Sequence, residues 1–150
     1  MFSVTYDDAE AYCAWRSERD GLQYGLPTDE EWEKAARGTD GRLFPWGDRY
    51  DASFCKNAGS SSERANPDSV GAYPADESPY GVRDMAGTVR EWCDAWFRRS
   101  HELRLVRGGS WNFDEIGAHA AYRLGCHANL SYPFIGFRLV HRPASPESVD

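Results

Sequence analysis

The pattern of hydrophobic and polar positions predicts two helices in the first quarter of the chain. One begins at Thr5 and ends at Gly21, and the other begins at Thr28 and ends at Gly38. In both, the threonine is followed three residues later by an acid, so that each side chain can cap a free backbone N–H of the first turn. Apolar residues then recur at helical spacing, and the glycines suit the left-handed turn that ends a helix.

Regular periodicity disappears from residue 39 to residue 79, where glycine, serine, asparagine and proline predict turns and irregular loop. Aromatic side chains in and near this stretch are expected to pack inward and hold it: Phe44, Trp46, Tyr50, Phe54 and Tyr73. Alternating segments return at 104–107 and 136–140 and predict strands. The pattern therefore indicates an α+β fold with short helices and a small antiparallel sheet. We expect a single domain over 1–142 and a disordered polar tail over 143–150.

Composition and charge narrow the function classes. The 150 residues include 17 Lys and Arg and 24 Asp and Glu, which gives a net charge of −7. This charge disfavours binding to nucleic acid or to an anionic membrane surface. No apolar stretch approaches the roughly 18 residues that a membrane span needs, and the first residues lack the pattern of a signal peptide, so a cytoplasmic location is expected. Four scattered cysteines are expected to be buried free thiols.

Two carboxylates seven residues apart, Asp84 and Glu91, flank Gly87. Calcium takes oxygen ligands from carboxylates and backbone carbonyls, and a glycine-bearing turn can aim several carbonyls at one point. The alternative is that Asp84 caps a turn and Glu91 pairs with an arginine. Arg123 and Arg138, which lie in apolar surroundings, are expected to form salt bridges with Asp84, Asp94 or Glu91.

Other candidate ligands are weaker. His119, Cys126 and His127 offer three soft-metal ligands, but a zinc site needs a fourth and their spacing matches no common zinc signature. Cys126 and His127 are sequence neighbours, which point apart in a strand and do not form a nucleophilic pair. The turn at 107–111, with paired glycines and Trp111, indicates close backbone packing.

Six segments taken together resemble the successive motifs of the formylglycine-generating enzyme, or sulfatase-modifying factor, family: 4–13, 26–38, 44–48, 80–92, 107–111 and 136–139. The resemblance implies the family's variant of the C-type lectin fold, and it implies calcium. By position, the side chains of Asp84 and Glu91 with the carbonyls of Gly87 and Val89 match one family calcium site. Asn57, with the Ala58 carbonyl, matches part of a second site whose downstream acid is not identified between Ser61 and Asp68.

The sequence departs from the family in its catalytic residues. The family's oxidases use two cysteines, five positions apart after the glycine-rich turn, to hold copper(I) and oxidise a substrate cysteine. Here these positions are Phe113 and Ala118, which have no soft ligand. We therefore expect neither copper nor formylglycine-generating activity. The family also has N-terminal strands before the first helix, so we expect another segment, or a second chain in an oligomer, to cover that edge.

Family members without the cysteine pair include accessory domains of bacterial kinases and variable proteins of diversity-generating retroelements, and the chain resembles both. The resemblance makes residues 111–134 a candidate ligand-binding surface, because they mix aromatic and polar side chains on a rigid scaffold. The leading hypothesis is a non-catalytic, calcium-stabilised domain that binds a protein or small ligand. The alternative is an oxidoreductase with a changed metal site built from His119, Cys126 and His127. The surface residues expected to contact the ligand are Trp111, Asn112, Phe113, Asp114, Ile116, His119, Tyr122, Leu124, His127, Asn129, Leu130, Tyr132 and Phe134.

Overall fold

The computed structural model describes residues 1–60 and 66–143. Apart from Pro143, the predicted tail lies outside the described residues. Residues 61–65, part of the segment in which an acidic ligand of the second calcium site was expected, also lie outside them. No helix in the described part of the chain is long and apolar enough to cross a membrane.

The two predicted helices are present as α1 (Tyr6–Asp20) and α2 (Asp29–Arg37). Thr5 and Thr28 each accept a hydrogen bond from the backbone N–H three residues on, and the acid at that position bonds back to the threonine N–H. Gly21 ends α1 in the left-handed conformation, with φ at 66°. Local sequence signals therefore account for both helices.

A four-stranded sheet forms the centre of the molecule, in the order β4-β3-β2-β5. Its members are β2 (Arg90–Trp96), β3 (Arg104–Arg107), β4 (Arg123–Cys126) and β5 (Ile135–Gly136). β3 runs antiparallel to both neighbours, whereas β5 runs parallel to β2. The expected antiparallel sheet thus has one parallel edge. A single helical turn, α3 (Glu115–Ala118), follows β3 and begins at Asp114, whose Oδ1 accepts from the Ile116 N–H at 3.1 Å.

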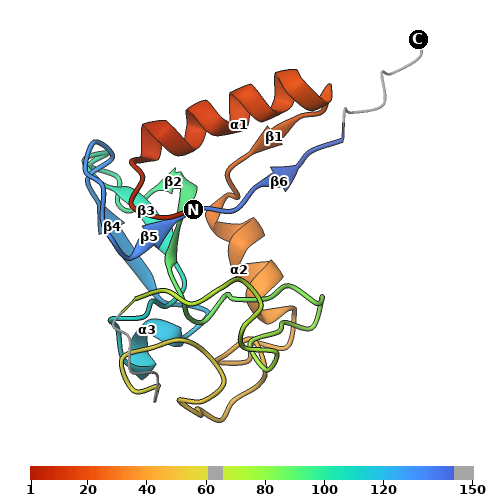
Figure 1. The fold of residues 1–150 in the computed structure, drawn as a ribbon, viewed down its shortest axis with the longest axis vertical. Coiled ribbons are helices and arrows are strands. Elements are labelled where there is room, and N and C mark those ends of the chain that lie inside the picture. Colours follow the sequence, from red (N-terminus) through yellow and green to blue (C-terminus); the bar gives the residue numbers. More distant parts are fainter. Residues whose placement is uncertain (61–65, 144–150) are drawn as a thin grey trace.

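The single strand predicted over 136–140 is wrong in extent. The segment instead divides into β5 and β6 (Val140–His141), which join different sheets: β6 pairs with β1 (Tyr24–Gly25) in a separate two-stranded ribbon. Alternation alone cannot locate such a division, because both halves have strand-like composition. In Figure 1, α1 and the β1–β6 ribbon lie together at one end of the molecule, and the long loops with α3 lie at the other.

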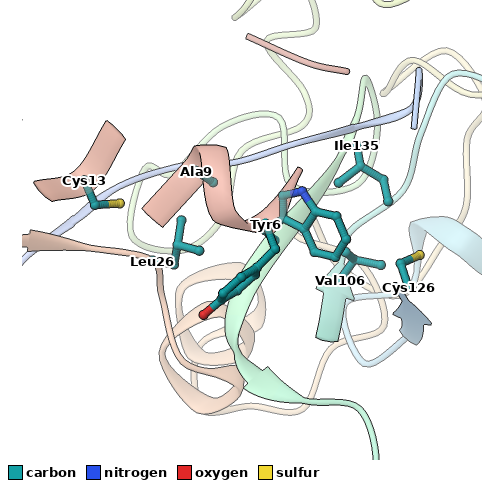
Figure 2. Close-up of a cluster of buried hydrophobic side chains, with 8 residues drawn as sticks. Tyr6, Ala9, Cys13, Leu26, Val106, Cys126 and Ile135 are labelled. Carbon is teal, nitrogen blue, oxygen red and sulfur yellow. The ribbon is translucent and has the colours of Figure 1, made fainter. Parts of the chain in front are cut away.

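Three clusters of buried side chains hold these parts together. The first joins α1 to the sheet, with Tyr6 packed edge-on against Trp92 at 5.9 Å between ring centroids. Figure 2 shows Ala9, Val106 and Ile135 in this cluster. The second gathers around Trp32 of α2.

The third cluster lies under the long loop around the buried Phe44. Phe44 contacts Trp46 and Tyr50, and Trp46 contacts Phe54, so four of the five predicted aromatics pack together. Tyr73 instead donates a hydrogen bond to Asp68 Oδ2 at 2.8 Å. The aromatic content of the loop therefore takes the place of regular secondary structure at this end of the molecule.

Candidate functional site

The first residues of β2 place two charged side chains, Arg90 and Glu91, inside the protein. They are 0% and 6% exposed. Successive residues of a strand point to opposite faces of the sheet, so the two side chains enter different environments. The candidate site is therefore two neighbouring environments separated by β2.

On one side, Glu91 is fully engaged. Trp32 Nε1 donates to Glu91 Oε2 at 2.7 Å, and Arg138 donates to both carboxylate oxygens, from Nε at 2.6 Å and from Nη2 at 2.8 Å. Arg138 Nη2 also bonds the Arg83 carbonyl at 3.0 Å. This two-point ion pair confirms the arginine pairing that the sequence left open for Glu91. Arg123, by contrast, pairs with Asp29 of α2 at 2.8 Å and not with any of the three acids considered.

Asp84 lies near this ion pair with a strained backbone, because its φ is 60°. Its Oδ2 accepts from the Gly71 N–H at 2.7 Å, which is the turn-capping role considered for it. Its Oδ1 is buried and has no hydrogen-bond partner among the described residues. Asp76, 1% exposed, accepts from the N–H groups of Met85 and Ala86, and burial raises the pKa of its carboxyl to about 7.

These residues fit calcium only in part. The orphaned Asp84 Oδ1 is what a cation ligand would leave when the ion is absent, but both oxygens of Glu91 are already bound to Arg138. Asn57 uses its Oδ1 to accept from the Gly59 N–H at 2.7 Å, and the Ala58 N–H donates to the Phe113 carbonyl. Within 1–60 and 66–143, no three His, Cys, Asp or Glu residues are grouped to hold a metal. The calcium ligands proposed from sequence, including Gly87 and Val89, stay a prediction.

The three candidate soft-metal ligands do not assemble. His119 packs edge-on against Phe44 at 4.9 Å, His127 is exposed, and Cys126 is buried. All four cysteines are free and buried. Burial raises the pKa of the Cys55 thiol to about 12 and that of Cys126 to about 11. Near neutral pH these two cysteines are therefore protonated thiols, and the thiolate form that acts as nucleophile or metal ligand is rare.

On the other side of β2, Arg90 has no carboxylate partner within residues 1–60 and 66–143. Its Nη1 donates to the Gly108 carbonyl at 2.8 Å, while Nε and Nη2 are buried without any partner in the described structure. Its guanidinium carbon lies 4.2 Å from the Phe113 ring centroid and 4.9 Å from that of Tyr122. Burial lowers the pKa of this guanidinium. Sequence reasoning missed Arg90, although its place beside Glu91 in an alternating segment was a usable signal.

The residues of the predicted binding surface divide into two sets by exposure, and two of them, Phe113 and Tyr122, contact Arg90. None of its thirteen residues is fully buried. The half-buried set faces the interior and comprises Trp111, Phe113, His119, Tyr122, Leu124, Tyr132 and Phe134. The exposed set comprises Asn112, Asp114, Ile116, His127, Asn129 and Leu130. The face thus has an aromatic inner layer and an exposed layer of mixed polarity.

A model of the sulfatase-modifying factor enzyme 1-like domain matches residues 1–143. The chain belongs to this family. The resemblance read from the six motifs is confirmed, and so is the α+β fold of C-type lectin type that it implied.

Curated relatives in this family include both inactive and active proteins. Inactive C-alpha-formylglycine-generating enzyme 2 of Bos taurus is 32% identical over 95% of this chain and 50% of its own length. Hercynine oxygenase of Mycolicibacterium smegmatis is 36% identical over 91% of this chain and 36% of its own. Serine/threonine-protein kinase pkn1 of Chlamydia caviae is 34% identical over 92% and 23%. The chain therefore spans half or less of the length of these relatives.

Among solved structures, Treponema denticola variable protein 1 superposes with a TM-score of 0.83 at 21% identity, over 95% of this chain and 71% of that one. This likeness shows a shared fold. Within it, Glu91 is paired with Arg138 on one side of β2, whereas Arg90 on the other side has two nitrogen atoms without a partner among the described residues.

Proposed function

We propose that this domain is a non-catalytic member of the sulfatase-modifying factor family that binds a protein or a small ligand through residues 111–134. The observation that carries the proposal is what occupies the two positions of the family's copper cysteines. Phe113 stacks on Arg90, and Ala118 is buried beside Phe44 and Cys55. Neither side chain has an atom that could bind copper or exchange a thiol.

Cys126 does not substitute for the missing pair. It lies eight residues beyond Ala118 and is buried, and its thiol has a pKa of about 11. The resemblance to a relative named as inactive agrees with this proposal. The half-buried aromatic layer and exposed polar layer of 111–134 provide the kind of surface on which a few anchoring side chains can carry most of the binding energy.

The test is incubation of the purified protein with a cysteine-containing peptide, copper and oxygen, followed by mass spectrometry. We expect no conversion of cysteine to formylglycine, at a copper concentration that supports a catalytic family member run in parallel. Turnover of the peptide by this protein would overturn the proposal.

The second candidate function is an oxidoreductase, which the 36% identity to hercynine oxygenase favours. The candidate metal ligands in this chain are His119, Cys126 and His127, which are not grouped within 1–60 and 66–143. Elemental analysis separates the two functions. Stoichiometric copper, iron or zinc that is lost when these three residues become alanine would favour the oxidoreductase.

We keep calcium as part of the first proposal. The buried, unpartnered Oδ1 of Asp84 supports it, and the Gly87 and Val89 carbonyls and Glu91 would complete the ligand set. An ion there would share Glu91 with Arg138. Calcium would supply positive charge that holds the 84–91 turn, with no part in chemistry.

The host system is also a proposal. The kinase relative and the likeness to a variable protein support an accessory domain and a diversified binding protein, respectively. Neighbouring genes distinguish them. A reverse transcriptase with a near-identical template copy of 107–140 would identify the variable protein, and an in-frame kinase would identify the accessory domain.

A further inference from the structure

Arg90 is a buried cation for which the described part of the chain supplies no anion. Two other arginines at the sheet show the contrast. Arg107, also 0% exposed, pairs with Glu33 and Asp29, and the partly buried Arg138 pairs with Glu91. An isolated buried charge is costly, and so is each buried N–H that has no hydrogen-bond partner. Arg90 has two such nitrogen atoms.

The two orphaned nitrogens lie on the same edge of the guanidinium. Nε and Nη2 point their N–H groups in parallel, which is the edge that grips a carboxylate side-on with two hydrogen bonds. The remaining nitrogen, Nη1, is already engaged by the Gly108 carbonyl at 2.8 Å. The free edge therefore has the donor geometry for one planar, two-oxygen anion.

The surroundings restrict which anion fits. An ideal Cβ at Gly117 would lie 2.9 Å from Arg90 Nη2 and 2.8 Å from the Phe113 ring, so only glycine leaves room at this point. The centroids of Phe113 and Tyr122 are 6.1 Å apart, whereas rings stacked on opposite faces of the guanidinium would be about 9 Å apart. The rings thus cover adjacent sides of Arg90. Both are only half-buried and belong to the proposed binding face.

We propose that Arg90 anchors a carboxylate of the ligand, which enters between Phe113 and Tyr122 and is held side-on by Nε and Nη2. The inference rests on the proposed function and names the chemical class that the face recognises. Because Arg90 is fully buried and its two rings are half-buried, a singly charged carboxylate costs less to desolvate there than a phosphate dianion. The carboxylate comes from a small organic acid or from the C-terminus of a peptide. Entry requires the two rings to turn outward, because Arg90 has no exposed surface in the ligand-free protein.

The decisive experiment follows the Arg90 Nε–Hε resonance by NMR during titration of the wild-type protein with sodium acetate. Sodium chloride at equal ionic strength is the control. We expect a saturable shift with acetate and none with chloride. N-acetylglycine represents a peptide C-terminus, and N-acetylglycinamide is its uncharged match. A response to N-acetylglycine at least tenfold tighter than to acetate would identify the peptide source, and equal or weaker binding would identify the small acid.

Two variants assign the binding to Arg90. Arg90→Met keeps an unbranched side chain of similar length without the charge, and we expect at least a tenfold loss of acetate affinity, measured as the ligand-induced rise in Tm. Arg83→Met is the matched control, because Arg83 is about half exposed and pairs with Glu77 on the surface. It should bind acetate as the wild type does.

Three results would overturn the inference: no acetate response of the wild-type protein beyond that of chloride, unchanged binding by Arg90→Met, or equal binding of inorganic phosphate. The wild-type titration does not depend on how well a variant folds. The outcome is also separable from the proposed function. If the protein neither binds acetate nor oxidises the peptide, the carboxylate inference fails and the non-catalytic role stands. If it binds acetate and oxidises the peptide, the carboxylate inference stands and the non-catalytic role fails.

Discussion

Arg90 and Glu91 are adjacent in sequence and both buried, yet their charges have different partners in the fold. Glu91 receives three hydrogen bonds, two of them from the oppositely charged Arg138. Arg90 donates one hydrogen bond, to the Gly108 carbonyl, and its guanidinium lies against the rings of Phe113 and Tyr122. A buried charge that is paired by other residues of the chain contributes to the fold. A buried charge without such a partner lowers the free energy of unfolding and is a candidate for a functional site. The difference teaches that the two faces of β2 have different roles.

The largest expected effect is on the Glu91 side. Glu91→Gln removes the negative charge and leaves the partly buried Arg138 with an uncharged partner, which should lower the free energy of unfolding by about 2–4 kcal/mol. Urea unfolding followed by circular dichroism measures it. Glu77→Gln, at an exposed ion pair with Arg83, is the control and should cost less than about 1 kcal/mol. Equal losses in the two variants would break the comparison.

Calcium removal tests whether the Glu91 side needs a second cation. An ion at 100 times its dissociation constant stabilises the native state by about 2.7 kcal/mol, so excess EGTA should lower Tm by several degrees. Asp84→Asn should remove most of this sensitivity, and Asp7→Asn, on the first turn of α1, should retain it. If EGTA leaves the Tm of the wild type unchanged, Arg138 alone supplies the positive charge at Glu91.

On the Arg90 side, a smaller effect is expected. Arg90→Met exchanges a buried charge that no described carboxylate pairs for an apolar chain, a change that is often neutral or stabilising, while the Gly108 carbonyl loses its donor. We expect the free energy of unfolding to stay within about 1 kcal/mol of the wild type in urea. A loss of 3 kcal/mol or more would show that the stacking of Phe113 and Tyr122 makes Arg90 a structural residue.

The smallest effect concerns the thiol near Arg90. Burial raises the pKa of Cys126 to about 11, and the nearby Arg90 opposes that shift. Iodoacetamide at pH 8 should therefore modify native Cys126 much more slowly than the unfolded chain, and Arg90→Met should slow it further. Because the folded pKa lies above the unfolded one, the related stability is present below pH 9 and is lost as pH rises through 11. Rapid native labelling would contradict the burial of Cys126.

Local signals predicted much of the framework. The two capping boxes and the glycine after α1 specify where both helices begin and where the first ends, because these interactions involve residues three or four positions apart. The inward packing of the loop aromatics was correctly predicted for four of the five, all but Tyr73, and the alternation at 104–107 correctly predicted β3. β5 and β6 were merged into one strand because their separation depends on which distant strand each one meets.

The candidate site was less accessible to sequence reasoning. The pairing of Glu91 with an arginine was one of two open alternatives, and Arg138 is 47 residues away. Arg123 was matched to the wrong acids, because its partner Asp29 lies on α2 and approaches only when that helix packs against β3. The place of Arg90 beside Glu91 could have marked it as a candidate, but its local sequence does not show which groups it meets in the folded domain.

The sequence by itself determined the family, the helix boundaries and the loss of the copper cysteines, since all of these are properties of residue order and short-range spacing. The tertiary structure decided which charges meet. It brought Arg138 and Trp32 to Glu91 and left Arg90 between two aromatic rings. The physical reason is that the electrostatic state of a buried group is set by atoms far apart in the chain, whose approach depends on the packing of the whole domain.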